Sequence, residues 1–180
     1  MIEQYFVRPA ELSDLAVIME IESLSFNANT QESSDVFKKR IMYFAEGFYI
    51  FLYQAQVIGF LTSEIWSKLP TQEDNNLAIN HSIEDVLNKK GSVLYISSFE
   101  LHPQFRNKGL GTYFFDCYLK DIKRKFHQLN KAVLIVNENW LQAISIYRKQ
   151  DFKLAFDIKK FFIEENGNKS AGLVLIRNFN

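Results

Sequence analysis

The stretch that decides the fold is Arg106-Asn107-Lys108-Gly109-Leu110-Gly111-Thr112. The apolar run Val93 to Leu101 before it predicts a buried strand, and Tyr113 to Phe126 after it has the spacing of an amphipathic helix. Glycines let backbone N–H groups approach an anion closely, and a helix start directs unpaired N–H groups and a positive dipole end at it. The stretch therefore predicts a phosphate site, and we expect a ligand that carries a pyrophosphate.

The glycine spacing excludes the two best-known nucleotide loops. Neither the dinucleotide pattern G-x-G-x-x-G nor the P-loop pattern G-x-x-x-x-G-K-[ST] is present. The pattern is instead [Q/R]-x-x-G-x-G, filled by Arg106, Gly109 and Gly111. Taken alone, it also fits a glycine turn that merely starts a helix.

A second motif follows the apolar run Ala132 to Val136, which predicts another strand. Asn139, Ala143 and Tyr147 are spaced at i, i+4 and i+8, so a helix over Asn139 to Lys149 places them on one face. A small residue lets a ligand pass close to the helix, and a phenol one turn later is placed to protonate a thiol or alkoxide. The alternative is that Tyr147 is simply part of the core.

The composition indicates one globular domain with no bias towards a charged partner. The chain has 180 residues, 47% of them hydrophobic, and its 21 basic side chains equal its 21 acidic ones. Neither nucleic acid nor a membrane surface is favoured by such a balance. We expect most of the 17 Phe and eight Tyr to pack in the core.

Cysteine and histidine are sparse. Cys117 is the single cysteine of the sequence, so we expect no intrachain disulfide, and no Cys/His spacing suits a metal. The N-terminus Met1 to Tyr5 lacks a leader pattern, and no apolar run approaches the ~20 residues of a membrane span. We expect a reduced, cytoplasmic protein.

The order of the expected elements favours one α+β domain with a mixed, mostly antiparallel sheet. Expected strands cover Tyr5 to Arg8, Phe48 to Gln54, Val57 to Trp66, Val93 to Leu101, Ala132 to Val136, Phe152 to Ile163 and Leu173 to Phe179. Besides the two helices above, expected helices cover Glu11 to Ser25, a segment capped at Ser33 to Asp35 and ended by Gly47, and His81 to Lys90. The hairpin turn is expected at Ala55-Gln56.

Together, His102-Pro103-x-x-Arg106-x-x-Gly109-x-Gly111 and Asn139…Ala143…Tyr147…Phe152 resemble the GNAT acyltransferase superfamily, and the resemblance covers the chain from 1 to 180. Val7-Arg8-Pro9-Ala10, Ile21-Glu22-x-x-Ser25-Phe26 and Ile58-Gly59-Phe60 are similar to its branch of arylalkylamine and bacterial small-molecule acetyltransferases. The resemblance implies a single acyl-CoA N-acyltransferase domain. Its α+β fold would have six to seven strands, helices on both faces and a splayed central strand pair.

The resemblance also implies a site for acetyl-CoA, without a metal. The pantetheine arm would lie between the two central strands, the glycine loop would hold the pyrophosphate, and Arg148 or Lys149 would be available to the 3′-phosphate. The implied acetyl-CoA-binding residues are Phe99, Leu101, Arg106, Asn107, Lys108, Gly109, Leu110, Gly111, Thr112, Asn139, Ala143, Tyr147 and Lys149. Asp151 stands where the family commonly has Gly, and we expect the turn to survive because Asp tolerates left-handed geometry.

The implied reaction is direct acyl transfer from the thioester to an amine. Tyr147 is the expected general acid, and the Leu101 N–H is a candidate oxyanion donor. The base is open. Strict alternation gives the site-facing side of the strand to Tyr95, Ser97 and Phe99, so Glu100 serves only if a bulge re-aims it. The other candidates are Glu64, Glu22 and water.

The favoured function is thus an acetyl-CoA-dependent N-acetyltransferase acting on a primary amine of a small molecule or peptide. Its acceptor site is expected from the first two helices, the loop Phe26 to Ser34 and the segment Ser67 to Lys90. Among their aromatic residues, Phe26, Phe37, Tyr43 and Trp66 hint at an apolar amine. A non-catalytic acyl-CoA sensor and a nucleotide-binding regulator are the alternatives, and a homodimer stays open.

Overall fold

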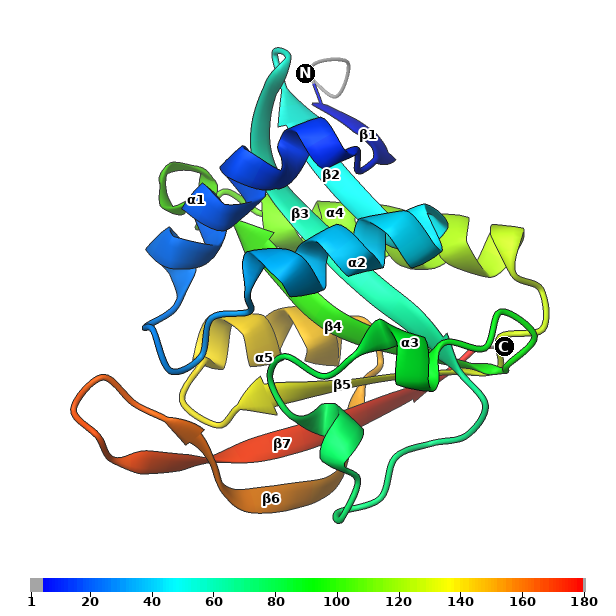
Figure 1. Ribbon diagram of the computed structural model, residues 1–180, viewed down its shortest axis with the longest axis vertical. Helices are drawn as coiled ribbons and strands as arrows, with labels where there is room; N and C mark the ends of the chain where they lie inside the picture. Colours follow the sequence, from blue (N-terminus) through cyan, green and yellow to red (C-terminus); the bar gives the residue numbers. More distant parts are fainter. Residues whose placement is uncertain (1–4, 180) are drawn as a thin grey trace.

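The computed structural model describes residues 5–179, so Met1 to Gln4, where no leader is expected, lie outside the described residues. Those residues form a seven-stranded sheet in the order β1-β2-β3-β4-β5-β7-β6 (Figure 1). The pair β4–β5 is parallel and the other neighbours are antiparallel. The predicted α+β class and the mixed, mostly antiparallel sheet are confirmed.

The strands are β1 Tyr5–Pro9, β2 Phe48–Tyr53, β3 Gln56–Trp66, β4 Val93–Leu101, β5 Lys131–Asn137, β6 Lys153–Ile163 and β7 Lys169–Asn178. The α-helices are α1 Leu15–Ser25, α2 Ser34–Phe44, α3 Ile83–Val86, α4 Leu110–Lys125 and α5 Leu141–Lys149. Short 3-10 turns cover Leu12–Asp14, Ala45–Gly47, Asn75–Leu77 and Pro103–Phe105.

Most boundaries match the sequence pattern, and the differences have local causes. The β2–β3 turn is Gln54-Ala55, one residue earlier than predicted, and both residues take positive φ (47° and 65°) as a type I′ turn requires. The helix predicted over His81 to Lys90 is only the single turn α3. The helix predicted from Asn139 begins at Leu141.

Helices cover both faces of the sheet, as expected. Figure 1 shows α1 and α2 in front of the central strands and α4 behind them. The Ser33 hydroxyl caps α2 by accepting from the Val36 N–H, and Phe37, Ile41 and Phe44 form the buried side of that helix. On the other face, α4 buries the stripe Leu110, Phe114, Tyr118 and Ile122. The sheet thus separates two apolar layers, and the site lies where β4 and β5 part.

Candidate functional site

The central strands β4 and β5 separate halfway along their length. Their parallel pairing runs from Val93 with Lys131 to Ile96 with Leu134 and then ends. β4 continues to Leu101 along β3, whereas β5 continues to Asn137 along β7. The gap leaves one edge of β4 without a neighbouring strand, and this is the splayed strand pair that the family resemblance implies.

The freed edge of β4 carries the backbone groups of Phe99 and Leu101. The His102 N–H donates to the Ile58 carbonyl (2.8 Å), so residue 102 faces β3. Because alternate residues of an antiparallel strand direct their N–H and C=O to opposite sides, Phe99 and Leu101 face the gap. An extended ligand arm can therefore pair with β4 as an added strand.

The glycine loop closes one end of this gap. Gly109 is the N-cap of α4 with φ 77°, a left-handed conformation that favours glycine, and a Cβ there would meet nothing within 4 Å. At Gly111 a Cβ would lie 2.8 Å from Cδ1 of Ile146, so this glycine lets α4 approach α5 closely. The first turn of α4 thus presents its unpaired N–H groups beside the open end of the gap.

The Arg106 side chain braces the loop. Its Nε donates to the Leu101 carbonyl (2.8 Å) and an Nη donates to the Ser25 hydroxyl of α1 (2.7 Å). Partial burial lowers the pKa of Arg106, against the opposing influence of the nearby Glu100 carboxyl. Its guanidinium therefore joins β4 to α1 within the site.

A cavity of about 780 Å³ occupies the gap. Of the predicted acetyl-CoA-binding residues, its lining includes Phe99, Leu101, Arg106, Asn107, Gly109, Gly111, Thr112, Asn139, Ala143, Tyr147 and Lys149. Lys108 and Leu110 lie outside the lining. The Lys108 ammonium lies 5.3 Å from the centre of the Phe105 ring, and Leu110 is buried in the core.

The second predicted wall of the cavity is also present. Asn139 precedes α5 and Ala143 and Tyr147 lie within it, and all three line the cavity. The Asn139 side chain already donates to Glu164 (3.2 Å). Tyr147 packs on Phe115, and burial, followed by the Glu100 charge, raises the pKa of its phenol. The phenol stays protonated, which is the form that a proton donor needs.

The turn after α5 survives without the glycine that the family commonly has there. Asp151 takes φ 60°, the left-handed geometry that this turn requires.

A β-bulge decides where Glu100 points. In the β3–β4 register Thr62 pairs with Ser98 and Ser63 with Ile96, so Ser97 is the extra residue. The Ser97 hydroxyl donates to the Thr62 carbonyl (3.1 Å). Beyond the bulge the alternation reverses. Strict alternation wrongly places Phe99 on the face of Tyr95; it packs instead on Phe115 of α4.

Glu100 consequently faces α1, where it meets Glu22. Both carboxyl groups are buried and line the cavity. Within residues 5–179, one oxygen of Glu22 accepts a hydrogen bond from the Glu32 N–H (2.7 Å). The other oxygen of Glu22 and both oxygens of Glu100 accept none from the groups around the pair. Burial raises the pKa of both groups, and Glu22 raises that of Glu100 further. We name Glu22 and Glu100 the carboxyl pair.

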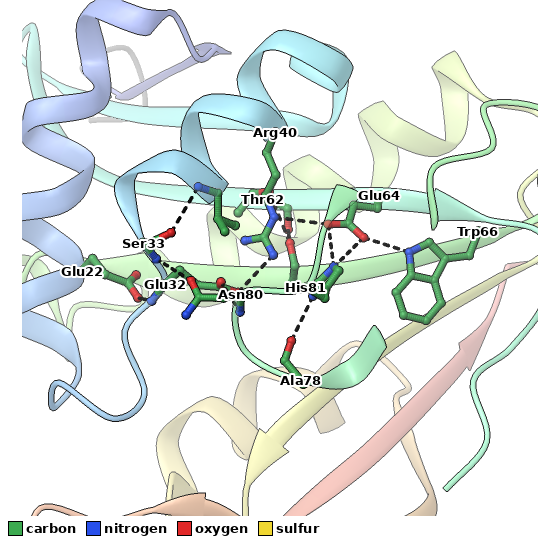
Figure 2. Close-up of polar contacts among 12 residues, drawn as sticks. Glu22, Glu32, Ser33, Arg40, Thr62, Glu64, Trp66, Ala78, Asn80 and His81 are labelled. Carbon is green, nitrogen blue, oxygen red and sulfur yellow. Dashed lines mark hydrogen bonds and ion pairs between the residues drawn. The ribbon is translucent and has the colours of Figure 1, made fainter. Parts of the chain in front are cut away.

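Glu64 belongs to a different environment (Figure 2). Its carboxylate accepts from Arg40 (3.2 Å), His81 (2.9 Å) and the Trp66 indole (2.9 Å), and it lies outside the cavity lining. These partners, His81 and Arg40 among them, hold its pKa below the usual range despite burial. Glu64 is thus an ion-pair residue of the core, and the structure removes it from the candidate bases. Sequence spacing gives no sign of this network, because α2, β3 and the loop before α3 each supply a member.

The part of the cavity that the sequence assigns to an acceptor differs from the expectation. Among the four aromatic residues named for it, only Phe26 lines the cavity. Phe37 and Trp66 are buried elsewhere, and Tyr43 is exposed on α2. The lining also includes Trp140, Phe161 and Phe162, which sequence reasoning did not single out. Their contribution depends on how the β6–β7 hairpin folds back, which no local pattern specifies.

Other classes of site find no support in residues 5–179. No group of three or more His, Cys, Asp and Glu side chains there is arranged to hold a metal ion. None of the helices in that range is long and apolar enough to cross a membrane.

Sequence comparison now places the chain. A model of the acetyltransferase (GNAT) family matches residues 15–152. The chain belongs to this family. A search of curated protein sequences found no match.

Solved structures share the fold at low sequence identity. The loading GNATL domain of CurA from Lyngbya majuscula has a TM-score of 0.80 at 15% identity, with 97% of each chain covered. The GphF GNAT-like decarboxylase in complex with isobutyryl-CoA has a TM-score of 0.80 at 14% identity, covering 96% of this chain and 98% of its own. Arabidopsis thaliana Naa50 with a bisubstrate CoA–peptide analogue has a TM-score of 0.71 at 16% identity, covering 98% and 99%.

Proposed function

We propose that the protein is an acetyl-CoA-dependent N-acetyltransferase that acts on a primary amine. The observation that carries the proposal is the freed edge of β4, which leads from Phe99 and Leu101 to the N-terminus of α4. A pantetheine arm pairs with such an edge, and a pyrophosphate suits the loop at its end. The CoA derivatives bound by GphF and Naa50 support this assignment. A cytoplasmic location fits the single cysteine and stays a prediction.

The cavity side chains suit direct transfer. A neutral amine nitrogen attacks the thioester carbon, the C–N bond forms and the C–S bond breaks. The Leu101 N–H faces the gap and is positioned for the developing oxyanion. Before the attack, Glu100 takes one proton from the ammonium. The Tyr147 phenol then donates a proton to the leaving thiolate, and the second proton that the nitrogen loses on becoming an amide returns to the phenolate through solvent. The bulge at Ser97 is what brings Glu100 to the acceptor side of the strand.

Two measurements on the full chain test the proposal. Calorimetry should show binding of acetyl-CoA. Thiol release with a panel of primary amines should show turnover, and mass spectrometry of the amine should show the gain expected when an acetyl group replaces a hydrogen. Acetyl-CoA binding without turnover on any amine would favour the acyl-CoA sensor instead. Nucleotide binding without CoA binding would favour a nucleotide regulator.

A further inference from the structure

The carboxyl pair is an unusual feature of the acceptor side. Glu22 is 0% and Glu100 is 4% exposed, and three of their four carboxyl oxygens receive no hydrogen bond within residues 5–179 from any group other than the neighbouring carboxyl of the pair. Buried polar groups are normally satisfied, because an unpaired one costs free energy. Both side chains line the cavity, so a ligand in the cavity can supply the missing donors. An ammonium group, with three N–H donors and a positive charge, fits this requirement.

The charge of the remaining lining limits the ligand to one such group. Glu32 is the third acidic residue of the lining, and its carboxylate is already occupied by Arg40 (3.0 Å) and the Asn80 N–H (2.7 Å). Arg106 also lies near Glu100 and offsets part of the negative charge of the pair. A second cationic group on the ligand, placed away from the pair, would therefore meet no unpaired carboxylate in this lining.

Aromatic side chains from three segments line the same cavity as this pair. The Phe26 ring stacks on Trp140 (centroids 4.9 Å apart, planes at 30°), and Trp140 contacts Phe162 (5.1 Å). All three line the cavity, and we name them the aromatic bridge. The Asn27 side chain donates to the Ile163 carbonyl (3.3 Å), which ties the end of α1 to β6 beside the bridge. The bridge offers flat apolar surfaces to whatever enters from this side.

We propose that the acceptor is a primary amine that carries one positive charge on an apolar, preferably aromatic, body. The carboxyl pair receives its ammonium group and the aromatic bridge receives its body. The inference rests on the proposed acetyltransferase function and adds the substrate class to it. A free arylalkylamine and a peptide that begins with an aromatic residue share this chemistry, and the experiment separates them.

The first arm uses the unmodified protein with acetyl-CoA and four acceptors: 2-phenylethylamine, a peptide beginning with Phe, a peptide beginning with Asp, and spermidine. We expect kcat/KM for one of the aromatic acceptors to exceed that for spermidine by about tenfold or more, because burying an unpaired charge is costly. The ratio between 2-phenylethylamine and the Phe peptide identifies the source. Equal or faster turnover of spermidine or of the Asp peptide overturns the inference while leaving the acetyltransferase function intact.

The second arm tests the residues. Glu22→Gln keeps the acceptor for the Glu32 N–H but removes the charge, so KM for the preferred aromatic amine should rise about tenfold to a hundredfold. Trp140→Leu should raise that KM about twofold to tenfold, which is the usual contribution of one aromatic contact to binding. The matched controls are Glu20→Gln, an exposed residue on the same helix, and Phe6→Leu, an exposed aromatic of β1, and neither should change KM.

Folding and donor binding are followed in parallel. Calorimetry of acetyl-CoA with each variant should give the affinity of the unmodified protein, which shows that the variant is folded and that its donor side is intact. If Glu22→Gln binds acetyl-CoA normally and keeps the KM of the unmodified protein, the carboxyl pair does not receive the ammonium. Failure of the unmodified protein to bind acetyl-CoA would instead reject the acetyltransferase function itself.

Discussion

The two sides of the cleft are built in different ways. The donor side consists of backbone groups, namely the freed edge of β4, the glycine loop and the first turn of α4. The acceptor side consists of side chains that α1, the 67–90 segment and β6 bring together. Backbone groups are the same in every sequence that adopts the fold, whereas side chains change freely. The fold is therefore shared with solved structures at 14–16% identity, whereas the proposed acceptor has to be inferred from this chain alone.

Removing the proposed base should have the largest effect. Glu100→Gln is expected to lower kcat by about 10²–10⁴-fold, the usual contribution of general base catalysis. The same change removes a buried ionisable carboxyl whose pKa is raised by burial and by Glu22, so the free energy of unfolding at neutral pH should rise, by about 1 kcal/mol. Steady-state kinetics and urea unfolding measure the two effects. An unchanged kcat would leave a water-mediated base or an amine that arrives deprotonated.

Breaking the buried ion network beneath the acceptor side should come next. Arg40 is 1% exposed and neutralises Glu32 and Glu64 together, so Arg40→Ala leaves two buried carboxylates without their cation (Figure 2). We expect a loss of about 3–5 kcal/mol in the free energy of unfolding, measured in urea.

The control for this change is Lys39→Ala on the same helix. Lys39 pairs with Glu84 at the surface, so its removal should leave the free energy of unfolding nearly unchanged. A loss for Arg40→Ala no larger than that of the control would show that the network adds little. The stability of the region around the proposed acceptor site would then come from contacts other than these ion pairs.

The same contrast explains what the sequence could predict. Strand β4 was predicted with its observed bounds, because a largely apolar run between Gly91 and Pro103 favours a buried strand. The glycine loop and α5 were recognisable because local spacing places Gly109, Gly111 and Tyr147. These features depend on residues close together in the chain, which is where sequence patterns carry information.

Long-range features were not accessible in this way. The bulge at Ser97 depends on the register between β3 and β4, and it alone decides that Glu100 faces α1. The pairing of Glu64 with Arg40 and His81 joins residues 24 and 17 positions apart. The aromatic bridge needs the β6–β7 hairpin to fold towards α1. Each depends on tertiary packing, which overrides local propensity.

A pair of glycine substitutions separates backbone strain from donor recognition. Gly109 and Gly167 both take positive φ (77° and 80°), and at both a Cβ would meet nothing within 4 Å. Each change to Ala should therefore cost about 1 kcal/mol of stability. Only Gly109 lines the cavity, so only Gly109→Ala should weaken acetyl-CoA binding, by about tenfold in calorimetry. Equal affinities in the two variants would place the pyrophosphate away from this loop.

The smallest expected effect is a shift in a pH profile. Protonated Glu100 cannot accept a proton, so kcat/KM should fall as the pH drops through its pKa, which burial and then Glu22 raise well above the usual range. In Glu22→Gln the neighbouring negative charge is gone, the ionised form of Glu100 is easier to reach, and the acidic limb should move to lower pH. Arg106, Ser25 and Tyr147 also face Glu100 and are unchanged in this variant. Glu20→Gln should keep the limb of the unmodified protein. If the acidic limb does not move in Glu22→Gln, the two carboxyls do not interact during turnover. Glu100 would then act on the acceptor without Glu22.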